Sequence, residues 1–333
     1  MNIGITYDLR EEYLKLGYSE EETAEFDKES TIAAIEETLV ELGHNTERIG
    51  NIWDLTNKLA NGSTWDLVFN IAEGLRGIGR EAQVPALLDA YNIPYTFSDP
   101  LVLSISLHKG MTKRVLRDLG IPTPKFYEVN SIEDVQKVDL EYPLFAKPIA
   151  EGTGKGIHAN SKITNKIQLE KVCTELLRLF KQTVLVEEFL PGREFTIGVV
   201  GTGSKARIVG SMEVILFGSA EQDVYSYTNK ENWEDKVKYK LVNDSDLTKA
   251  EEFVLAAWKG LGCRDAGRVD VRIDRNGIPN IIELNPLAGI HPTHSDLPII
   301  CNLKNIPYKT LFRWIIDSAT ERLNPNITFS QDQ

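Results

Sequence analysis

Hydrophobic and polar residues follow two different periods in the first part of the chain. Alternation in "MNIGITYDL" predicts a short strand. Apolar residues at positions 32, 35, 39 and 42 then have the spacing of one helix face, with Ser30 or Thr31 as candidate N-cap. "WDLVFNIA" predicts another strand, and "REAQVPALLDAYNIPY" predicts a helix that ends in a turn. Strands alternating with helices predict an α/β module with a parallel sheet over residues 1–95.

The next part of the chain begins with a longer apolar-periodic stretch. "SDPLVLSISLHKGMTKRVLRDLG" predicts one helix through Lys109 and Leu116 that stops at Gly120. "PLFAKPI", "NKIQLEKVCTELLRLF" and "TVLVEEFL" then predict strand, helix and strand. We therefore expect a second module over about residues 96–183.

The remaining residues, 184–333, carry antiparallel signals. "REFTIGVVG" is expected to pair with "KARIVGSMEVI", and "GRVDVRID" with "PNIIELN". Residues 218–240 form a polar stretch whose length is typical of lids over active sites or of disordered segments. The expected fold is mixed α/β and α+β, with an N-terminal parallel module followed by two α+β modules.

Composition narrows the class of protein. The 333 residues are 42% hydrophobic, which suffices for packed cores, and carry a net charge of −12. That acidity argues against a nucleic-acid partner, and no stretch approaches the ~20 apolar residues of a membrane span. The start has no basic region before an apolar run, as a secretion signal would have. Three widely separated cysteines fit neither a disulfide framework nor a zinc site, so a cytoplasmic protein is expected.

The stretch "GRVDVRIDRNGIPNIIELNP" combines a hairpin signal with several charges. If Asn276-Gly277 forms a two-residue turn, counting outward places Asp270 opposite Glu283 and Arg268 opposite Asn285 on one face. The other face then holds four apolar residues: Val269, Val271, Ile282 and Leu284. Opposed carboxylates destabilise a sheet, and Mg²⁺ would offset them. The alternative is a solvated face neutralised by neighbouring arginines.

Two further stretches have features of a nucleotide site. "AKPIAEGTGKGIH" places Lys147 at a strand end before a glycine-rich loop that could approach phosphate closely, although Gly156 after Lys155 departs from a P-loop. Taken alone, this loop is equally compatible with a flexible turn. In "TVLVEEFLPGREFTIG", an apolar crossing suits an adenine ring, and the acid Glu194 that follows could accept ribose hydroxyls. An ordinary crossover with surface acids is the alternative.

These elements occur in an order that resembles the ATP-grasp superfamily, and within it the D-alanine–D-alanine ligases. The resemblance covers nearly the whole chain and rests mainly on "GRVDVRID…IIELN" and "VEEFLPGREFTIGVV". It implies ATP held between two modules, with one or two Mg²⁺ ions, for which Mn²⁺ could substitute, on the residues matching Asp270, Glu283 and Asn285. It implies nucleotide contacts at Lys109, Lys147, Gly154, Glu187, Glu188, Phe189, Leu190, Glu194 and Lys230.

The chemistry implied by the resemblance is amide formation between two amino-acid-like substrates through an acyl phosphate. Arg268 is the expected guanidinium on that intermediate, and Thr153 supplies a hydroxyl in the glycine-rich loop. A homodimer is also implied by the family. The candidate substrate residues are Glu25, for the first substrate's ammonium, with His294 and Ser295 for the second substrate's carboxylate.

The chain departs from that family in its substrate-binding segments. The segment after the first strand is longer and glycine-poor, Glu73 stands near the place of a family histidine, and Glu231 stands where the family often has tyrosine. Asp296 is an unusual neighbour for a bound carboxylate. Three functions therefore remain open: a D-alanine–D-alanine ligase, a ligase of the same chemistry for an L-amino acid, β-amino acid or peptide, and a non-catalytic ATP-binding regulator.

Overall fold

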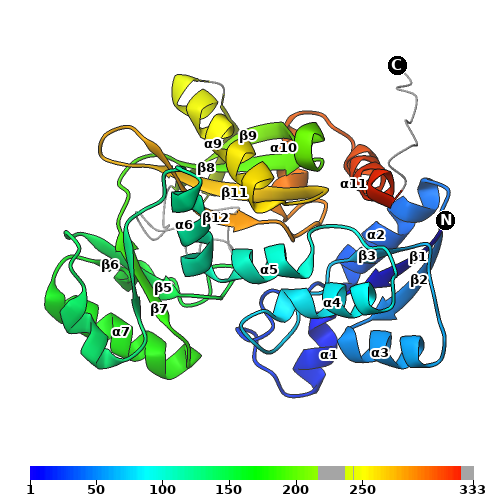
Figure 1. Ribbon diagram of the computed structural model, residues 1–333, viewed down its shortest axis with the longest axis horizontal. Helices are drawn as coiled ribbons and strands as arrows, with labels where there is room; N and C mark the ends of the chain where they lie inside the picture. The colour runs from blue at the N-terminus through cyan, green and yellow to red at the C-terminus, as the bar shows by residue number, and fades with distance from the viewer. Residues whose placement is uncertain (217–236, 243, 324–333) are drawn as a thin grey trace.

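The computed structural model describes residues 1–216, 237–242 and 244–323, and its strands form three sheets (Figure 1). The three-stranded sheet near the N-terminus and the four-stranded sheet of residues 126–188 lie at opposite ends of the molecule. The five-stranded sheet lies between and above them (Figure 1). Among the described residues, no helix is both long and apolar enough to cross a bilayer.

The N-terminal sheet is parallel and has the order β2-β1-β3. Its elements are β1 (Asn2–Thr6), α1 (Arg10–Lys15), α2 (Glu29–Glu41), β2 (Asn45–Gly50), α3 (Ile52–Ala60), β3 (Leu67–Asn70) and α4 (Gln83–Ala90). The four expected elements and the parallel sheet are confirmed, but α1, β2 and α3 were not predicted. The expected N-cap is wrong, because α2 begins at Glu29 with Lys28 in the cap position, so Ser30 and Thr31 lie inside the first turn.

The C-terminal helix α11 (Tyr308–Leu323) packs against this first sheet, in a buried cluster that also includes residues of the third sheet. Phe312 stacks on Phe69 of β3 with ring centroids 5.1 Å apart. The buried cluster around them joins Ile3 and Ile5 of β1 to Ile315 of α11. The first and last parts of the chain therefore share one hydrophobic core.

The middle sheet is antiparallel and has the order β4-β7-β5-β6. It comprises β4 (Phe126–Val129), β5 (Leu144–Pro148), β6 (Lys162–Ile163) and β7 (Val184–Glu188), with α7 (Lys166–Phe180) packed on it. The expected module boundary at residue 183 separates β7 from the sheet to which it belongs, so a boundary after Glu188 fits the sheet better. The division into three modules otherwise stays a prediction.

The single helix expected through Lys109 is two helices, α5 (Pro100–Leu107) and α6 (Lys109–Asp118). His108 separates them with an extended ψ of 90°, and its Nδ1 accepts a hydrogen bond from the backbone N–H of Met111 at 3.2 Å. The break places Lys109 at the first position of α6. Because side chains four residues apart share a helix face, Lys113 lies on the same side one turn later.

The third sheet has the order β10-β9-β8-β11-β12. It comprises β8 (Glu194–Val200), β9 (Arg207–Leu216), β10 (Val237–Leu241), β11 (Ala266–Ile273) and β12 (Pro279–Asn285), with α9 (Ser245–Leu261) and α10 (Asp296–Leu303) packed against it. Both expected antiparallel pairings are confirmed. Residues 218–236 of the expected lid lie outside the described residues. Its end is not a loop, because the alternating run from Val237 to Leu241 pairs with β9.

The β11–β12 hairpin has the expected register at its charged end and a different turn. Asp270 pairs with Glu283 and Arg268 with Asn285, as predicted. Beyond Asp270 the register shifts by one residue, so Val271 pairs with Ile281. The expected core position of Ile282 is therefore wrong: Ile281 is buried in the core, and Ile282 lines a pocket on the other side. This bulge compensates for a turn that is one residue longer than Asn276-Gly277.

Candidate nucleotide and metal site

A pocket lies between the middle sheet and the third sheet, with Lys109 at its edge. Its walls come from strands of both sheets, from the glycine-rich loop after β5, and from the connection between β7 and β8. The lining residues are Lys109, Pro124, Phe145, Lys147, Glu151, Gly154, Ile157, Glu187, Glu188, Phe189, Leu190, Glu194, Asp270, Arg272, Ile282 and Glu283. Every described residue expected at the nucleotide therefore lines this pocket, and Lys230 lies outside the described residues.

Glu187 lies between two lysines at the inner wall of the pocket. Its Oε1 is 2.8 Å from Lys147 Nζ, and its Oε2 is 2.8 Å from Lys113 Nζ. Burial opposes the charge of Lys147, but Glu187 and Glu283 outweigh it and raise the lysine's pKa. Burial also opposes ionisation of Glu187, and the two lysines lower its pKa nonetheless. The Glu187 carboxylate is therefore ionised between two ammonium groups, Lys147 in the pocket wall and Lys113 behind it.

Lys113 was not identified from the sequence, although its position one turn after Lys109 was a usable signal. Its side chain is 1% exposed, and its Nζ also donates to Thr123 Oγ1 at 3.0 Å. Thr123 in turn donates to the carbonyl oxygen of Ile281 in β12. Burial lowers the pKa of Lys113 to about 8 despite Glu187. Lys113 thus connects α6, the middle sheet and the third sheet beneath the pocket.

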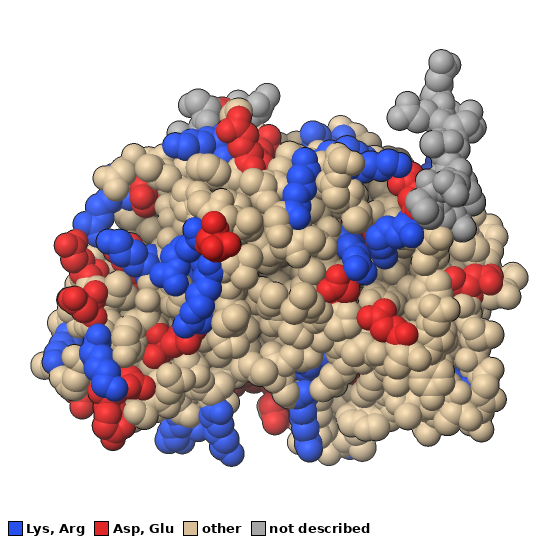
Figure 2. All heavy atoms as spheres, in the orientation of Figure 1, with Lys and Arg blue, Asp and Glu red and all other residues tan. Residues whose placement is uncertain are grey.

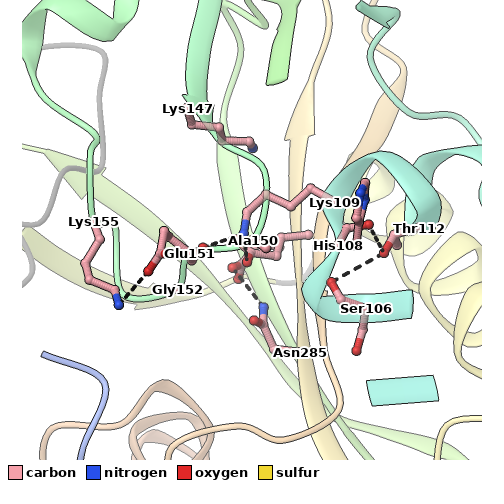
Figure 3. Close-up of polar contacts among 12 residues, drawn as sticks. Ser106, His108, Lys109, Thr112, Lys147, Ala150, Glu151, Gly152, Lys155 and Asn285 are labelled. Carbon is pink, nitrogen blue, oxygen red and sulfur yellow. Dashed lines mark hydrogen bonds and ion pairs between the residues drawn. The ribbon is translucent and has the colours of Figure 1, made fainter. Parts of the chain in front are cut away.

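Lys109 connects the glycine-rich loop to the acidic end of the hairpin. Its Nζ donates to the carbonyl oxygen of Glu151 at 2.5 Å and lies 3.0 Å from Glu283 Oε1. Figure 3 shows the Lys109 side chain extending from the start of its helix toward this loop, with Lys147 on the strand above it. Lys109 and Lys147 thus lie at one end of the pocket, near the paired acids.

The paired acids lie where the hairpin predicts them. Asp270 Oδ1 accepts from Thr196 Oγ1 at 2.9 Å, and Asn285 Nδ2 lies 3.5 Å from Asp270 Oδ2. No group of three or more His, Cys, Asp or Glu side chains suited to a metal ion occurs in the described part of the chain. The donors here are instead two carboxylates and one amide. That set suits Mg²⁺, which completes its six oxygen ligands with phosphates and water.

Arg268 lies beside this acidic face and outside the pocket lining. Its Nη1 contacts Asp270 Oδ2, and its Nε lies 3.3 Å from Asp296 Oδ2. Burial opposes the charge on the guanidinium, but Asp270 and Asp296 outweigh it and raise the pKa of Arg268. The arginine therefore remains charged next to the position expected for the transferred phosphoryl group.

Glu25 contacts the glycine-rich loop. Its Oε1 accepts from the backbone N–H of Gly152 at 2.5 Å, and its Oε2 lies 3.1 Å from Lys155 Nζ and 2.8 Å from Arg80 Nη2. Arg80 also donates to the carbonyl oxygen of Ala150 at 2.8 Å. The carboxylate expected for a substrate ammonium is thus occupied by the chain's own cations. Neither Arg80 nor Lys155 was assigned a role from the sequence.

Thr153 and the loop before α10 hold the remaining expected residues. Thr153 lies in the glycine-rich loop with a φ of 54°. Ser295 Oγ accepts from the backbone N–H of His291 at 2.9 Å, and the rings of His291 and His294 lie 4.5 Å apart. Burial lowers the pKa of His291, so this ring is neutral near pH 7. Asp296, the residue after Ser295, contacts Arg268. The catalytic role expected of Thr153 and the substrate roles expected of His294 and Ser295 stay predictions.

Two partly buried acids of the N-terminal part, Glu73 and Glu81, have raised pKa values. Burial and neighbouring acids raise the pKa of Glu73 well above its usual value. Burial likewise raises the pKa of Glu81 to about 8, and the charges that act on it include those of Lys109 and Glu283. The part of the site facing the first sheet is therefore rich in carboxyl groups.

Known proteins resemble this chain in sequence and in fold. Residues 115–317 match the family described as "D-ala D-ala ligase C-terminus". A D-alanine–D-alanine ligase of Aquifex aeolicus is 31% identical over 287 residues, which is 85% of this chain and 92% of the relative. One from Marinomonas sp. is 30% identical over 267 residues, covering 79% and 80%. The crystal structure of the Bacillus anthracis enzyme complexed with ATP superimposes with a TM-score of 0.72 at 20% identity, covering 98% of this chain and 100% of that one.

Proposed function

Because the chain belongs to the D-alanine–D-alanine ligase family and has the ATP-grasp fold, we propose that it is an ATP- and Mg²⁺-dependent carboxylate–amine ligase. The reaction joins two amino-acid-like substrates through an acyl phosphate. The observation that carries this proposal is the single pocket wall that brings Lys109, Lys147 and Glu187 next to the opposed carboxylates Asp270 and Glu283.

The nucleotide is proposed to lie along this wall. Phe189 and Leu190, in the connection between the two sheets, supply apolar contact for the base, and Glu194 is placed to accept ribose hydroxyls. Lys109 and Lys147 then meet the phosphates at the acidic end of the pocket. The glycine-rich loop around Gly154 covers the phosphates, because glycine allows backbone N–H groups to approach an anion closely.

Asp270, Glu283 and Asn285 are proposed to hold Mg²⁺, which when bound offsets phosphate charge. The ion pairs of Glu283 and Asp270 support this arrangement. Lys109 pairs with Glu283, and Arg268 with Asp270, so each acid already has a cation that can turn to a phosphate oxygen when the acid binds a metal. The two carboxylates and their two cations thus balance in charge in the unloaded site.

The reaction proceeds in two steps. A carboxylate oxygen of the first substrate attacks the γ-phosphorus, the bond to the bridging oxygen of ADP breaks, and an acyl phosphate forms. The second substrate's amine then attacks the acyl carbon, a C–N bond forms, and inorganic phosphate leaves with the carbon–oxygen bond pair while the amine loses a proton. Arg268 stabilises the negative charge that develops on the intermediate, and the loop around Gly154 limits access of water.

The substrates are proposed to be amino-acid-like, without an assignment to D-alanine. Glu25, placed at the first substrate by resemblance, is paired with Arg80 and Lys155, and Asp296 adjoins the place of the second substrate. These contacts favour a ligase for other amino-acid-like substrates over a cell-wall enzyme. A homodimer in the cytoplasm stays a prediction from the family.

The test is ADP release by the purified protein with Mg²⁺–ATP and D-alanine, followed by pools of L-, D- and β-amino acids, with mass spectrometry of the products. Amino-acid-dependent ADP release together with a condensed product supports the proposal. ADP release that Arg268→Ala leaves intact would contradict the catalytic role of Arg268. Arg264→Ala is the matched control, because Arg264 pairs with Asp99 away from the pocket.

A further inference from the structure

Asp296 pairs with Arg268, the arginine proposed to stabilise the acyl phosphate, next to the place proposed for the second substrate. Its side chain is only 12% exposed, and its Oδ2 lies 3.3 Å from Arg268 Nε. The other face of the guanidinium contacts Asp270 through Nη1. In the proposed function Asp270 binds a metal ion, so Asp296 is the acid that stays with Arg268 when the site is loaded.

The other cations described around the site are also paired with acids. These pairs are Lys109 with Glu283, Lys147 with Glu187, Lys155 with Glu25 and Glu151, Arg80 with Glu25, and Arg272 with Glu194. His291, in the loop that leads to Asp296, is neutral near pH 7 because burial lowers its pKa. A carboxylate next to Arg268 would thus meet a neutralised guanidinium and the like charge of Asp296.

We infer that Asp296 determines the second substrate, and that this substrate is an amine without a carboxylate on the carbon that bears the amino group. Amino-acid amides and the N-terminal residues of peptides belong to this class, which leaves His294 and Ser295 without the carboxylate that the resemblance implies for them. A carboxylate beside the attacking nitrogen would be repelled by Asp296, whereas an approaching ammonium group is attracted before it loses its proton. This inference rests on the proposed function, because it concerns the second step of the same reaction.

Stabilisation of helix α10 alone does not explain why the Asp296 side chain is turned toward Arg268. Asp296 is the first residue of α10, where a negative charge stabilises a helix. An exposed side chain would serve that purpose equally well, yet the Asp296 carboxylate is buried against Arg268. Glu29 provides a matched control: it also lies in the first turn of a helix, but its side chain is 57% exposed and pairs with Arg48 in the N-terminal part.

The experiment measures the two half-reactions separately. Hydroxylamine replaces the acceptor first, so that any first substrate activated by Mg²⁺–ATP is trapped as a hydroxamate. With that donor fixed, acceptors are compared in pairs that differ only in the carboxylate, such as glycine with glycinamide and alanine with alaninamide. Wild type, Asp296→Asn and Glu29→Gln are compared by kcat/KM for each acceptor.

We expect the wild type to prefer each amide over the free amino acid by at least ~10-fold, which corresponds to ~1.4 kcal/mol. Asp296→Asn should reduce this ratio about 10-fold while hydroxamate formation persists, and Glu29→Gln should leave the ratio unchanged. A wild-type preference for the free amino acids, or a ratio that Asp296→Asn does not move, would overturn the inference alone. If no donor pool yields a hydroxamate, the proposed function is contradicted, and this inference with it.

Discussion

Glu187 illustrates at the scale of single residues how the pocket balances its charges. Each of its carboxylate oxygens has its own ammonium group, Lys147 on one side and Lys113 on the other. Removing one partner from a buried ionic group is costly, because the remaining charges must rearrange. Lys113 therefore positions Glu187 and leaves Lys147 available to phosphate, although Lys113 does not itself line the pocket.

Replacing Lys113 with Met should weaken ATP binding by ~10-fold. Without Lys113, Glu187 has only Lys147 as a partner, and the phosphate-facing ammonium is more fully neutralised. Titration calorimetry with Mg²⁺–ATP measures the change. Lys137→Met is the control, since Lys137 is 63% exposed on the surface. Unchanged ATP affinity in a folded Lys113→Met protein would show that Glu187 does not need its second lysine.

Asp27 should make the stability of the protein fall as the pH rises. Burial, with a contribution from Asp8, raises the pKa of its carboxyl group from 3.8 to about 7. The folded protein thus keeps a proton that the unfolded chain has lost, so the stabilisation is complete below about pH 4 and is lost as the pH rises through about 7.

Between pH 4 and pH 8, the free energy of unfolding should fall less in Asp27→Asn than in the wild type, by on the order of 2 kcal/mol. Urea unfolding at several pH values gives the two free-energy profiles, whose difference isolates this group from Glu73 and Glu81. Parallel profiles for the two proteins would mean that Asp27 titrates normally in the folded state.

At the scale of elements, the β12 bulge shows which structural features the sequence discloses. Counting from an Asn276-Gly277 turn placed Asp270 opposite Glu283, which is the observed pairing because the bulge compensates for a turn that is one residue longer. The bulge could not be read from the pattern, because Ile281 and Ile282 are equally apolar and only tertiary packing decides which enters the core. The break between α5 and α6 was missed for a related reason: the apolar residues on both sides fit one continuous helix.

Ile281 and Ile282 should respond to truncation in opposite ways. Ile281 is 1% exposed in the core, so Ile281→Ala should cost ~2–4 kcal/mol of stability. Ile282 lines the pocket, so Ile282→Ala should weaken ATP binding several-fold with a stability cost below ~1 kcal/mol. Chemical denaturation and nucleotide titration on both variants check this. A larger loss of stability in Ile282→Ala than in Ile281→Ala would instead support the register without a bulge, in which Ile282 enters the core.

At the scale of the whole molecule, the site depends on segments that are distant in sequence. Arg80 and Glu25 from the N-terminal part hold Ala150, Gly152 and Lys155 of the glycine-rich loop. The family resemblance, which local motifs carry, identified many of the residues that line the pocket, but not Pro124, Phe145 or Arg272. It did not predict this contact, since nothing local relates residue 80 to residue 150. Figure 2 shows acidic and basic side chains next to one another on one face of the molecule.

Arg80→Met should release the glycine-rich loop from the N-terminal part. Both the guanidinium contact to Ala150 and the alignment of Glu25 toward Gly152 and Lys155 are lost in this variant. Limited proteolysis within residues 150–158 should become ~10-fold faster, and Mg²⁺–ATP should restore part of the protection. Arg48→Met, which breaks exposed pairs with Glu29 and Glu36, is the control. Equal cleavage rates in the two variants would refute the contact's role.

The central claim is that ATP activates a carboxylate, and transfer of oxygen tests it most directly. Amino-acid pools labelled with ¹⁸O in their carboxyl groups are incubated with the protein, Mg²⁺–ATP and an amine in unlabelled water, and the released phosphate is analysed by mass spectrometry. An acyl phosphate requires that one carboxylate oxygen leaves with the phosphate, so the account predicts phosphate carrying one ¹⁸O atom. Phosphate without the label, or no ATP consumption with any pool, would contradict it.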